Sequence, residues 1–134
     1  MKKVVILILV SMLLNSCKRD AAIPATNKVL PSINGTWQLI QITGGFGGGG
    51  TPVAPNNNVI TFNENGSFIG SIQQLITDQG GTYAVTPNND PSYSFEYKLS
   101  FNQSQDDYFL KISHDTLNLA CDCNDGFGFV FLKK

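Results

Sequence analysis

The most constraining feature of this sequence is an unbroken alternation of large apolar and polar residues from position 93 to position 101. The apolar members are Tyr93, Phe95, Tyr97, Leu99 and Phe101, and the residues between them are Ser94, Glu96, Lys98 and Ser100. A period of two places alternate side chains on opposite faces of an extended chain. The pattern therefore predicts a β-strand over residues 93–101 with one face buried in a core.

Seven further segments combine β-branched and aromatic residues with turn residues at their ends, which is typical of short strands. They cover residues 36–42, 59–63, 67–76, 82–85, 108–113, 116–121 and 127–132. Asn65-Gly66, between the second and third of these, is a strong signal for a tight hairpin. His114-Asp115 predicts another turn, and no segment has the apolar period of a helix.

Eight short strands joined mostly by tight turns predict a single all-β domain with the topology of an antiparallel meander. A meander has two open edges, and closure into a barrel removes them. We therefore expect an eight-stranded barrel, closed or nearly closed, and a two-sheet β-sandwich stays open as the alternative. An eight-stranded barrel has room inside for side chains or for one small ligand.

The first and last predicted strands resemble those of lipocalin-like domains. Gly35-Thr36-Trp37 is similar to the G-x-W signature of lipocalins, whose tryptophan closes one end of the barrel. Residues 60–68 and 125–133 look like parts of lipocalin-like domains in lipoproteins of the Bacteroidota. The resemblance spans residues 33–134 and implies a calycin-type β-barrel in which Trp37 is buried. Two features depart from true lipocalins: residues 106–108 match their T-D-Y motif only in part, and the last strand offers lysines where an arginine stacks on the tryptophan.

The first seventeen residues resemble a bacterial lipoprotein signal peptide. Two lysines precede an apolar stretch over residues 4–14, which is too short to span a bilayer comfortably. Residues 14–17, Leu-Asn-Ser-Cys, are similar to a lipobox. This resemblance implies cleavage after Ser16 and acylation of Cys17 with diacylglyceryl and fatty-acyl (palmitate-type) chains.

We therefore expect three parts: a signal peptide at residues 1–16, a lipidated tether at residues 17–32 and the barrel domain at residues 33–134. The expected location is the cell envelope, anchored in the outer membrane at its periplasmic face or at the cell surface. Each buried methylene of the anchor contributes about 0.8 kcal/mol. From Cys17 onward the chain has seven basic and ten acidic residues, a formal balance of −3. No basic cluster stands beside aromatic residues, so we expect no nucleic-acid partner.

The motifs that suggest catalysis or metal binding are incomplete. Residues 44–50 are rich in glycine, but threonine and proline follow where a phosphate-binding loop needs a lysine and a helix. Residues 122–126 lack the glycine spacing of an EF-hand and the glutamate at its end. Ser113, His114 and Asp115 are adjacent, so their side chains alternate in direction and do not converge as a triad does. We expect no enzymatic activity, no cofactor and no metal.

Two covalent modifications are suggested in the C-terminal part. Cys121 and Cys123 are two apart on a predicted strand, which places their Cα atoms roughly 6.5–7 Å apart, at the stretched limit for a disulfide. A disulfide at a bend and two unpaired thiols both stay open, and a metal site is disfavoured because His114 is the single histidine. Residues 115–117, Asp-Thr-Leu, are similar to an O-glycosylation acceptor site of Bacteroidota envelope proteins, which implies modification of Thr116.

Two functions are compatible with these features. In the first, the anchored barrel binds a small apolar ligand, since aromatic side chains with a few hydroxyl groups suit such a molecule. The expected lining is Phe68, Tyr93, Phe95, Tyr97, Leu99, Phe101, Phe127, Phe129 and Phe131. The same side chains would equally fill a solid core. A cavity of roughly 300 Å³ or more lined by these side chains would favour the ligand carrier.

In the second function, the protein is a non-enzymatic interaction or structural module. It would dock a protein or a glycan through its loops, of which residues 44–50 and 78–91 offer the longest adaptable surfaces. The identity of the ligand or partner is not encoded in any motif of the sequence.

Overall fold

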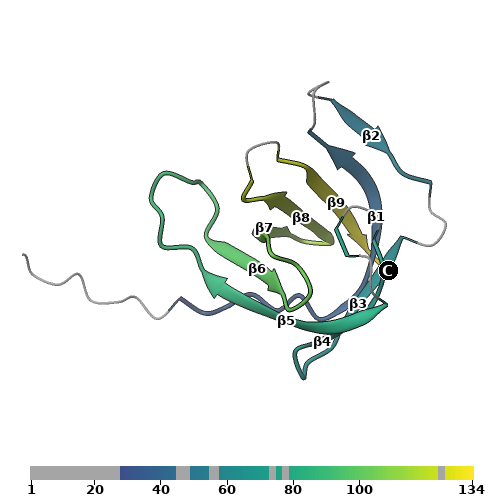
Figure 1. Ribbon diagram of the computed structural model, residues 1–134, viewed down its shortest axis with the longest axis horizontal. Coiled ribbons are helices and arrows are strands. Elements are labelled where there is room, and N and C mark those ends of the chain that lie inside the picture. Colours follow the sequence, from purple (N-terminus) through teal and green to yellow (C-terminus); the bar gives the residue numbers. More distant parts are fainter. Residues whose placement is uncertain (1–27, 45–48, 55–57, 73–74, 77–78, 124–125) are drawn as a thin grey trace, which may run out of the picture.

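The computed structural model describes residues 28–44, 49–54, 58–72, 75–76, 79–123 and 126–134. The expected signal peptide, Cys17 and most of the expected tether lie outside these ranges, as do residues 45–48 of the glycine-rich segment and residues 124–125. The described residues are all-β and contain no helix (Figure 1). The strands are β1 (Gly35–Thr43), β2 (Gly50–Pro52), β3 (Val59–Phe62), β4 (Ser67–Gly70), β5 (Gly80–Pro87), β6 (Tyr97–Phe101), β7 (Asp107–Ser113), β8 (Thr116–Cys121) and β9 (Gly128–Lys133).

Eight of these strands close into an antiparallel barrel, as expected. From β3 to β9 each strand pairs with the next along the chain, and β1 pairs with both β3 and β9. The closing pairs run from Trp37 opposite Lys133 to Thr43 opposite Gly128. This closure excludes the two-sheet sandwich. The ninth strand, β2, was not predicted: it pairs with β1 at residues 41–43, beyond the end of β3.

The alternation of β1 is interrupted by a bulge. Its register against β9 shifts between Leu39 and Gln41, so Ile40 is an extra residue and is partly exposed. A bulge changes which face the following residues occupy. Leu39 therefore faces the interior before the bulge and Ile42 packs against the core after it.

Trp37 is buried inside the barrel, as the G-x-W resemblance implies. Its side chain is 1% exposed, and its Nε1–H donates a 2.7 Å hydrogen bond to the carbonyl oxygen of Ile33. The ammonium of Lys133, directly opposite on β9, lies 5.4 Å from the centre of the indole ring. Lys133 thus provides a cation over the tryptophan although the strand carries no arginine.

One predicted strand, residues 67–76, is shorter in the structure. β4 ends at Gly70, which has φ +124°, and a Cβ there would lie 2.2 Å from the carbonyl oxygen of Val59. Beyond it the chain turns tightly, so that Ile72 and Ile76 exchange backbone hydrogen bonds and both side chains enter the core. The strand therefore ends early at Gly70, in a backbone conformation that residues with a Cβ rarely adopt.

Candidate functional site

Most of the expected ligand lining is packed core. Phe68, Leu99, Phe101, Phe129 and Phe131 are only 0–3% exposed. The ring of Phe101 lies 5.2 Å from that of Phe68 in an edge-to-face contact and 6.0 Å from that of Tyr108. Side chains covered this completely leave no water-sized space against their surfaces. These five residues occupy the interior as protein core, and a ligand has no room against them.

The remaining four predicted lining residues lie elsewhere. Tyr93 is 46% exposed and Phe127 is 40% exposed, so neither belongs to the interior. Phe95 is half-buried against the outside of β7, and Tyr97 is half-buried at the start of β6. The placement of Tyr93, Phe95 and Phe127 in an interior lining was therefore wrong.

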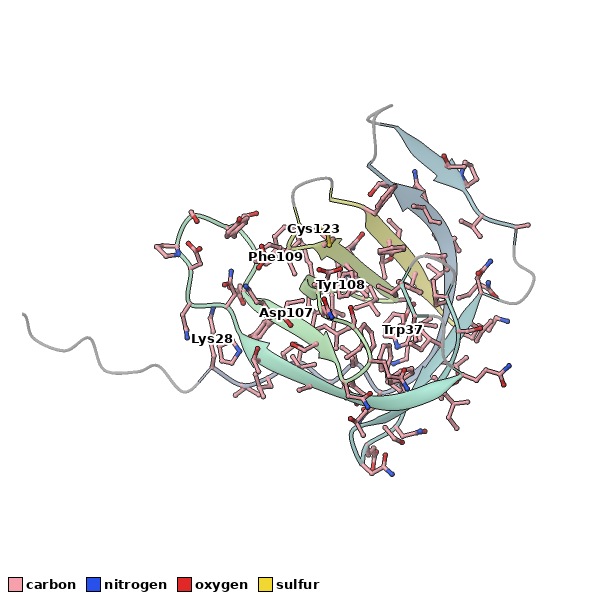
Figure 2. All side chains as sticks on the ribbon, in the orientation of Figure 1. Lys28, Trp37, Asp107, Tyr108, Phe109 and Cys123 are labelled. Carbon is pink, nitrogen blue, oxygen red and sulfur yellow. A yellow bond between two sulfur atoms is a disulfide. The ribbon has the colours of Figure 1, made fainter. Side chains whose placement is uncertain are left out.

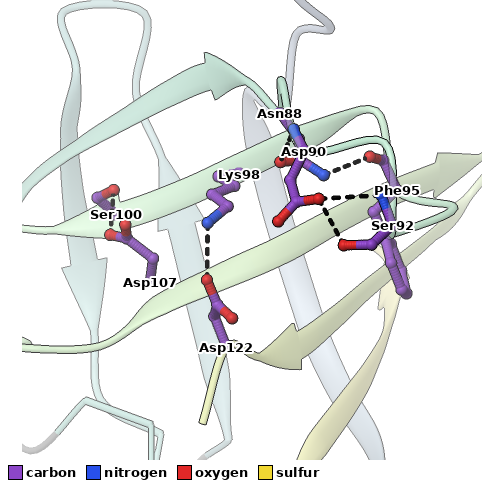
Figure 3. A network of polar contacts seen from close by, with 8 residues as sticks. All are labelled: Asn88, Asp90, Ser92, Phe95, Lys98, Ser100, Asp107 and Asp122. Atoms are coloured by element: carbon purple, nitrogen blue, oxygen red, sulfur yellow. Dashed lines mark hydrogen bonds and ion pairs between the residues drawn. The ribbon is translucent and has the colours of Figure 1, made fainter.

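The predicted strand over residues 93–101 begins only at Tyr97 because local turn chemistry holds the preceding residues in a loop (Figure 3). The Asn88 amide group donates to the carbonyl oxygen of Phe95, and the Asn88 backbone N–H donates to that of Glu96. The Asp90 carboxylate accepts hydrogen bonds from the Ser92 hydroxyl and backbone N–H, which lower its pKa. Asn and Asp side chains form such local bonds readily. The alternation of apolar and polar residues therefore begins at Tyr93 in the sequence, although the strand itself begins at Tyr97.

Tyr93 and Phe95 instead cover an aromatic ring on the outside of the barrel. Phe109 faces outward from β7 and is nevertheless only 3% exposed. Its ring lies 4.2 Å from that of Tyr93 and 5.5 Å from that of Phe95, and the Lys98 ammonium lies 4.9 Å from its centre. We call Tyr93, Phe95, Lys98 and Phe109 the outer cluster. The outer cluster was not predicted from the sequence, although the apolar run from Tyr108 to Leu110 breaks the alternation and indicates burial on both faces of β7.

Acidic residues surround Lys98 on this face. Its ammonium donates a 2.7 Å hydrogen bond to the Asp122 carboxylate, which raises the pKa of Lys98. The Asp107 carboxylate accepts a 2.6 Å hydrogen bond from the Ser100 hydroxyl (Figure 3). The carbonyl oxygen of Asp107 accepts a hydrogen bond from the backbone N–H of Asp122. These bonds hold the start of β7 and the end of β8 against β6.

A pocket lies where β6 and β7 separate. The two strands pair only as far as Tyr97 opposite Leu110, whereas β7 continues to Ser113. The last residues of β7 therefore have no partner in β6. The pocket has a volume of about 260 Å³ and is open to solvent. We call it the rim pocket; its lining is Ser94, Phe95, Glu96, Tyr97, Leu110, Lys111 and Ile112. Two of the nine predicted lining residues, Phe95 and Tyr97, therefore contribute to a cavity.

The lining of the rim pocket combines apolar side chains with charged and polar groups. Phe95, Leu110 and Ile112 supply the apolar surface. Glu96 and Lys111 are both exposed and add two opposite charges to the lining. Such a mixture suits a molecule with an apolar body and a polar group.

The N-terminal segment reaches the same end of the barrel. The Tyr97 hydroxyl donates a 3.1 Å hydrogen bond to the Val29 carbonyl oxygen, and the Lys28 ammonium lies 5.5 Å from the centre of the Tyr97 ring. Figure 2 shows Lys28 beside the end of the barrel that carries the loop between β5 and β6. Residues 28 and 29 therefore lie beside Tyr97, a residue that lines the rim pocket.

The predicted modification sites cluster around β8. Cys121 and Cys123 are joined by a disulfide, with Cα atoms 5.2 Å apart, so of the two open alternatives the structure has the bridge. Thr116 is half-buried at the start of β8, and its glycosylation stays a prediction. His114 occupies the preceding turn with φ 53° and is exposed, and its Nδ1 lies 3.4 Å from the Ser113 hydroxyl.

No protein-family model, no curated protein and no solved structure matches this chain. Among the residues that the structure covers, no helix has the length and hydropathy needed to cross a bilayer.

Proposed function

We propose that this protein is a lipid-anchored, non-enzymatic barrel of the cell envelope that binds a small apolar ligand in the rim pocket. The anchor rests on the lipobox resemblance at residues 14–17 and on Cys17. The observation that carries the binding function is the rim pocket itself, in which aromatic and aliphatic side chains meet two charged groups. The binding site thus lies at one end of the barrel, in the rim pocket, and not in the interior, where the sequence predicted it.

The dimensions of the rim pocket limit the ligand. Its volume of about 260 Å³ lies just below the ordinary range of small-molecule sites, which begins at roughly 300 Å³. A suitable ligand is therefore small, with an apolar part against Phe95 and Ile112. A carboxylate or sulfonate on it would be attracted to Lys111, which projects from β7.

A fluorescent dye with this chemistry, anilinonaphthalene sulfonate, tests the proposal on chain 18–134. Ile112→Trp places an indole in the rim pocket and should weaken dye binding at least about tenfold, equivalent to 1.4 kcal/mol. Ile69→Trp is the matched control, because Ile69 is 63% exposed on β4 and does not line the pocket. Absence of dye binding to the folded parent, or equal binding by the Ile112→Trp variant, would contradict the proposal.

The alternative, docking of a protein or glycan through the loops, is favoured by one observation. The ring of Tyr93 is 46% exposed in the loop before β6, where Asn88 and Asp90 supply polar groups beside it. Exposed aromatic rings flanked by polar groups are common in recognition surfaces. If the parent binds no dye but is retained on immobilised envelope polysaccharide, and Tyr93→Ala abolishes that retention, this alternative replaces the rim-pocket function.

A further inference from the structure

The disulfide between Cys121 and Cys123 holds the chain in a bent conformation. Residues two apart on an extended strand have Cα atoms roughly 6.5–7 Å apart, whereas these are 5.2 Å apart. β8 ends at Cys121, and Cys123 lies beyond the strand. Reduction of the bridge would therefore remove one restraint on the bend at Asp122, and the backbone hydrogen bond from Asp122 to Asp107 would remain.

The bridge contributes little to holding the fold together. It closes a loop of three residues, and the stabilisation from a disulfide decreases as the loop it closes becomes shorter. The connection between β8 and β9 has other supports. The backbone N–H of Cys121 donates to the Phe127 carbonyl oxygen, and five residue pairs from Thr116 opposite Leu132 to Ala120 opposite Gly128 align the two strands.

Asp122 lies between the two cysteines and is held from two sides: by the bridge, and by its backbone N–H, which donates a hydrogen bond to the carbonyl oxygen of Asp107. The Asp122 carboxylate binds the Lys98 ammonium (Figure 3), and that ammonium lies over the ring of Phe109. The side chains of Lys98 and Asp122 are 25% and 32% exposed, so the ion pair is near the surface. The ion pair thus joins the residue between the two cysteines to Lys98 of the outer cluster.

We propose that Cys121 and Cys123 form a redox-active pair that undergoes thiol–disulfide exchange with a dithiol, and that its reduction releases Asp122 from Lys98. Cys123 is exposed and Cys121 is half-buried, so an attacking thiolate can reach the sulfur of Cys123. This attack forms a mixed disulfide and frees Cys121 as a thiolate. The second thiol of the reductant then displaces Cys123. Two electrons and two protons pass to the cysteine pair, and the reductant becomes a disulfide.

If reduction of the bridge weakens the ion pair, then the ion pair must stabilise the disulfide relative to the two thiols, because linkage between two sites is reciprocal. Removing the ion pair should make the disulfide easier to reduce. An exposed ion pair contributes about 0.2–1 kcal/mol, which corresponds to about a 1.5–5-fold change in the equilibrium constant for reduction.

The test uses chain 17–134 with Cys17→Ser, so that Cys121 and Cys123 are the only cysteines present. The protein is equilibrated with mixtures of reduced and oxidised dithiothreitol, free thiols are alkylated, and the reduced fraction is read by intact mass. Circular dichroism of the same samples reports whether the barrel stays folded. We expect reduction of the folded protein, and Lys98→Met should shift the midpoint about 1.5–5-fold towards reduction. Asp122→Asn should act in the same direction.

Lys134→Met is the matched control, because Lys134 lies at the C-terminus and its structural contact is a backbone hydrogen bond to Thr36. This variant should leave the midpoint unchanged. The proposal is overturned if the bridge is reduced only when the barrel unfolds, or if both Lys98→Met and Asp122→Asn keep the midpoint of the parent. It is also overturned if the Cys121→Ser, Cys123→Ser double variant fails to fold, because the bridge would then be structural. None of these outcomes depends on dye binding in the rim pocket.

Discussion

Replacing Trp37 by alanine removes the largest fully buried side chain of the barrel. Truncation of a buried tryptophan costs about 3–5 kcal/mol. Here the variant also loses the hydrogen bond to the Ile33 carbonyl oxygen and the contact with the Lys133 ammonium. We therefore expect a loss of about 4–5 kcal/mol, a large share of the 5–15 kcal/mol that is typical of a domain.

Urea unfolding followed by far-ultraviolet circular dichroism measures this loss, since Trp37 is the only tryptophan and its fluorescence disappears with it. With a denaturant slope of about 2 kcal/mol per molar, the midpoint should fall by roughly 2 M. Trp37→Phe keeps an aromatic ring but leaves the Ile33 carbonyl without its donor, and should cost about 1–3 kcal/mol. Ile69→Ala, at an exposed position, should cost under about 1 kcal/mol. A Trp37→Ala midpoint no lower than that of Ile69→Ala would refute the burial of Trp37 described above.

Three further outcomes are expected. Gly70→Ala should cost about 2 kcal/mol or more in thermal unfolding, because Gly70 has φ +124° and its new Cβ would meet the Val59 carbonyl. Gly80→Ala, at an ordinary φ, should cost less, and equal losses would contradict this reasoning. Burial raises the pKa of Tyr108 above 10.0, so the unfolded state loses this proton first. The contribution of Tyr108 to stability should be constant below about pH 10 and should be lost as the pH rises towards its folded-state pKa. Tyr108→Phe should reduce the alkaline fall in stability, and an unchanged alkaline slope would contradict the stated cause. Cys17→Ser should abolish acylation and membrane retention, and continued partitioning into detergent would contradict the lipid anchor.

The architecture was predictable because most strands of this barrel obey a single rule. Alternation, together with β-branched and aromatic segments bounded by turn residues, predicted a segment for each of the eight barrel strands, and Asn65-Gly66 forms the expected turn, with Gly66 at φ 77°. β2 was not predictable from alternation. It is only three residues long and consists of Gly, Thr and Pro, so it has no buried face to leave a pattern.

The candidate site was harder to predict because its residues obey competing rules. Tyr93 and Phe95 continue the alternation of β6, but Asn88 and Asp90 hold them in a loop through bonds that a two-residue period does not register. The aromatic pair therefore covers Phe109 outside the barrel, and the space beside Tyr97 becomes the rim pocket. Alternation identifies which residues are buried but not against which surface they are buried.

The spacing of Cys121 and Cys123 shows a similar limit. An extended strand holds two such residues at the stretched limit of a disulfide, so strand geometry alone left the bridge and the free thiols open. In the structure the chain leaves β8 at Cys121 and shortens the Cα–Cα distance to 5.2 Å. The bend that decides between the two alternatives depends on where the strand ends, which is the least predictable property of any element.

Native mass spectrometry of the protein extracted from its own envelope tests the central proposal most directly. The account predicts a chain that begins at an acylated Cys17 and carries a small molecule, which is lost in the Ile112→Trp variant and kept in the Ile69→Trp variant. A chain that carries no acyl group and no bound molecule would contradict the account, as would a bound molecule that Ile112→Trp leaves in place.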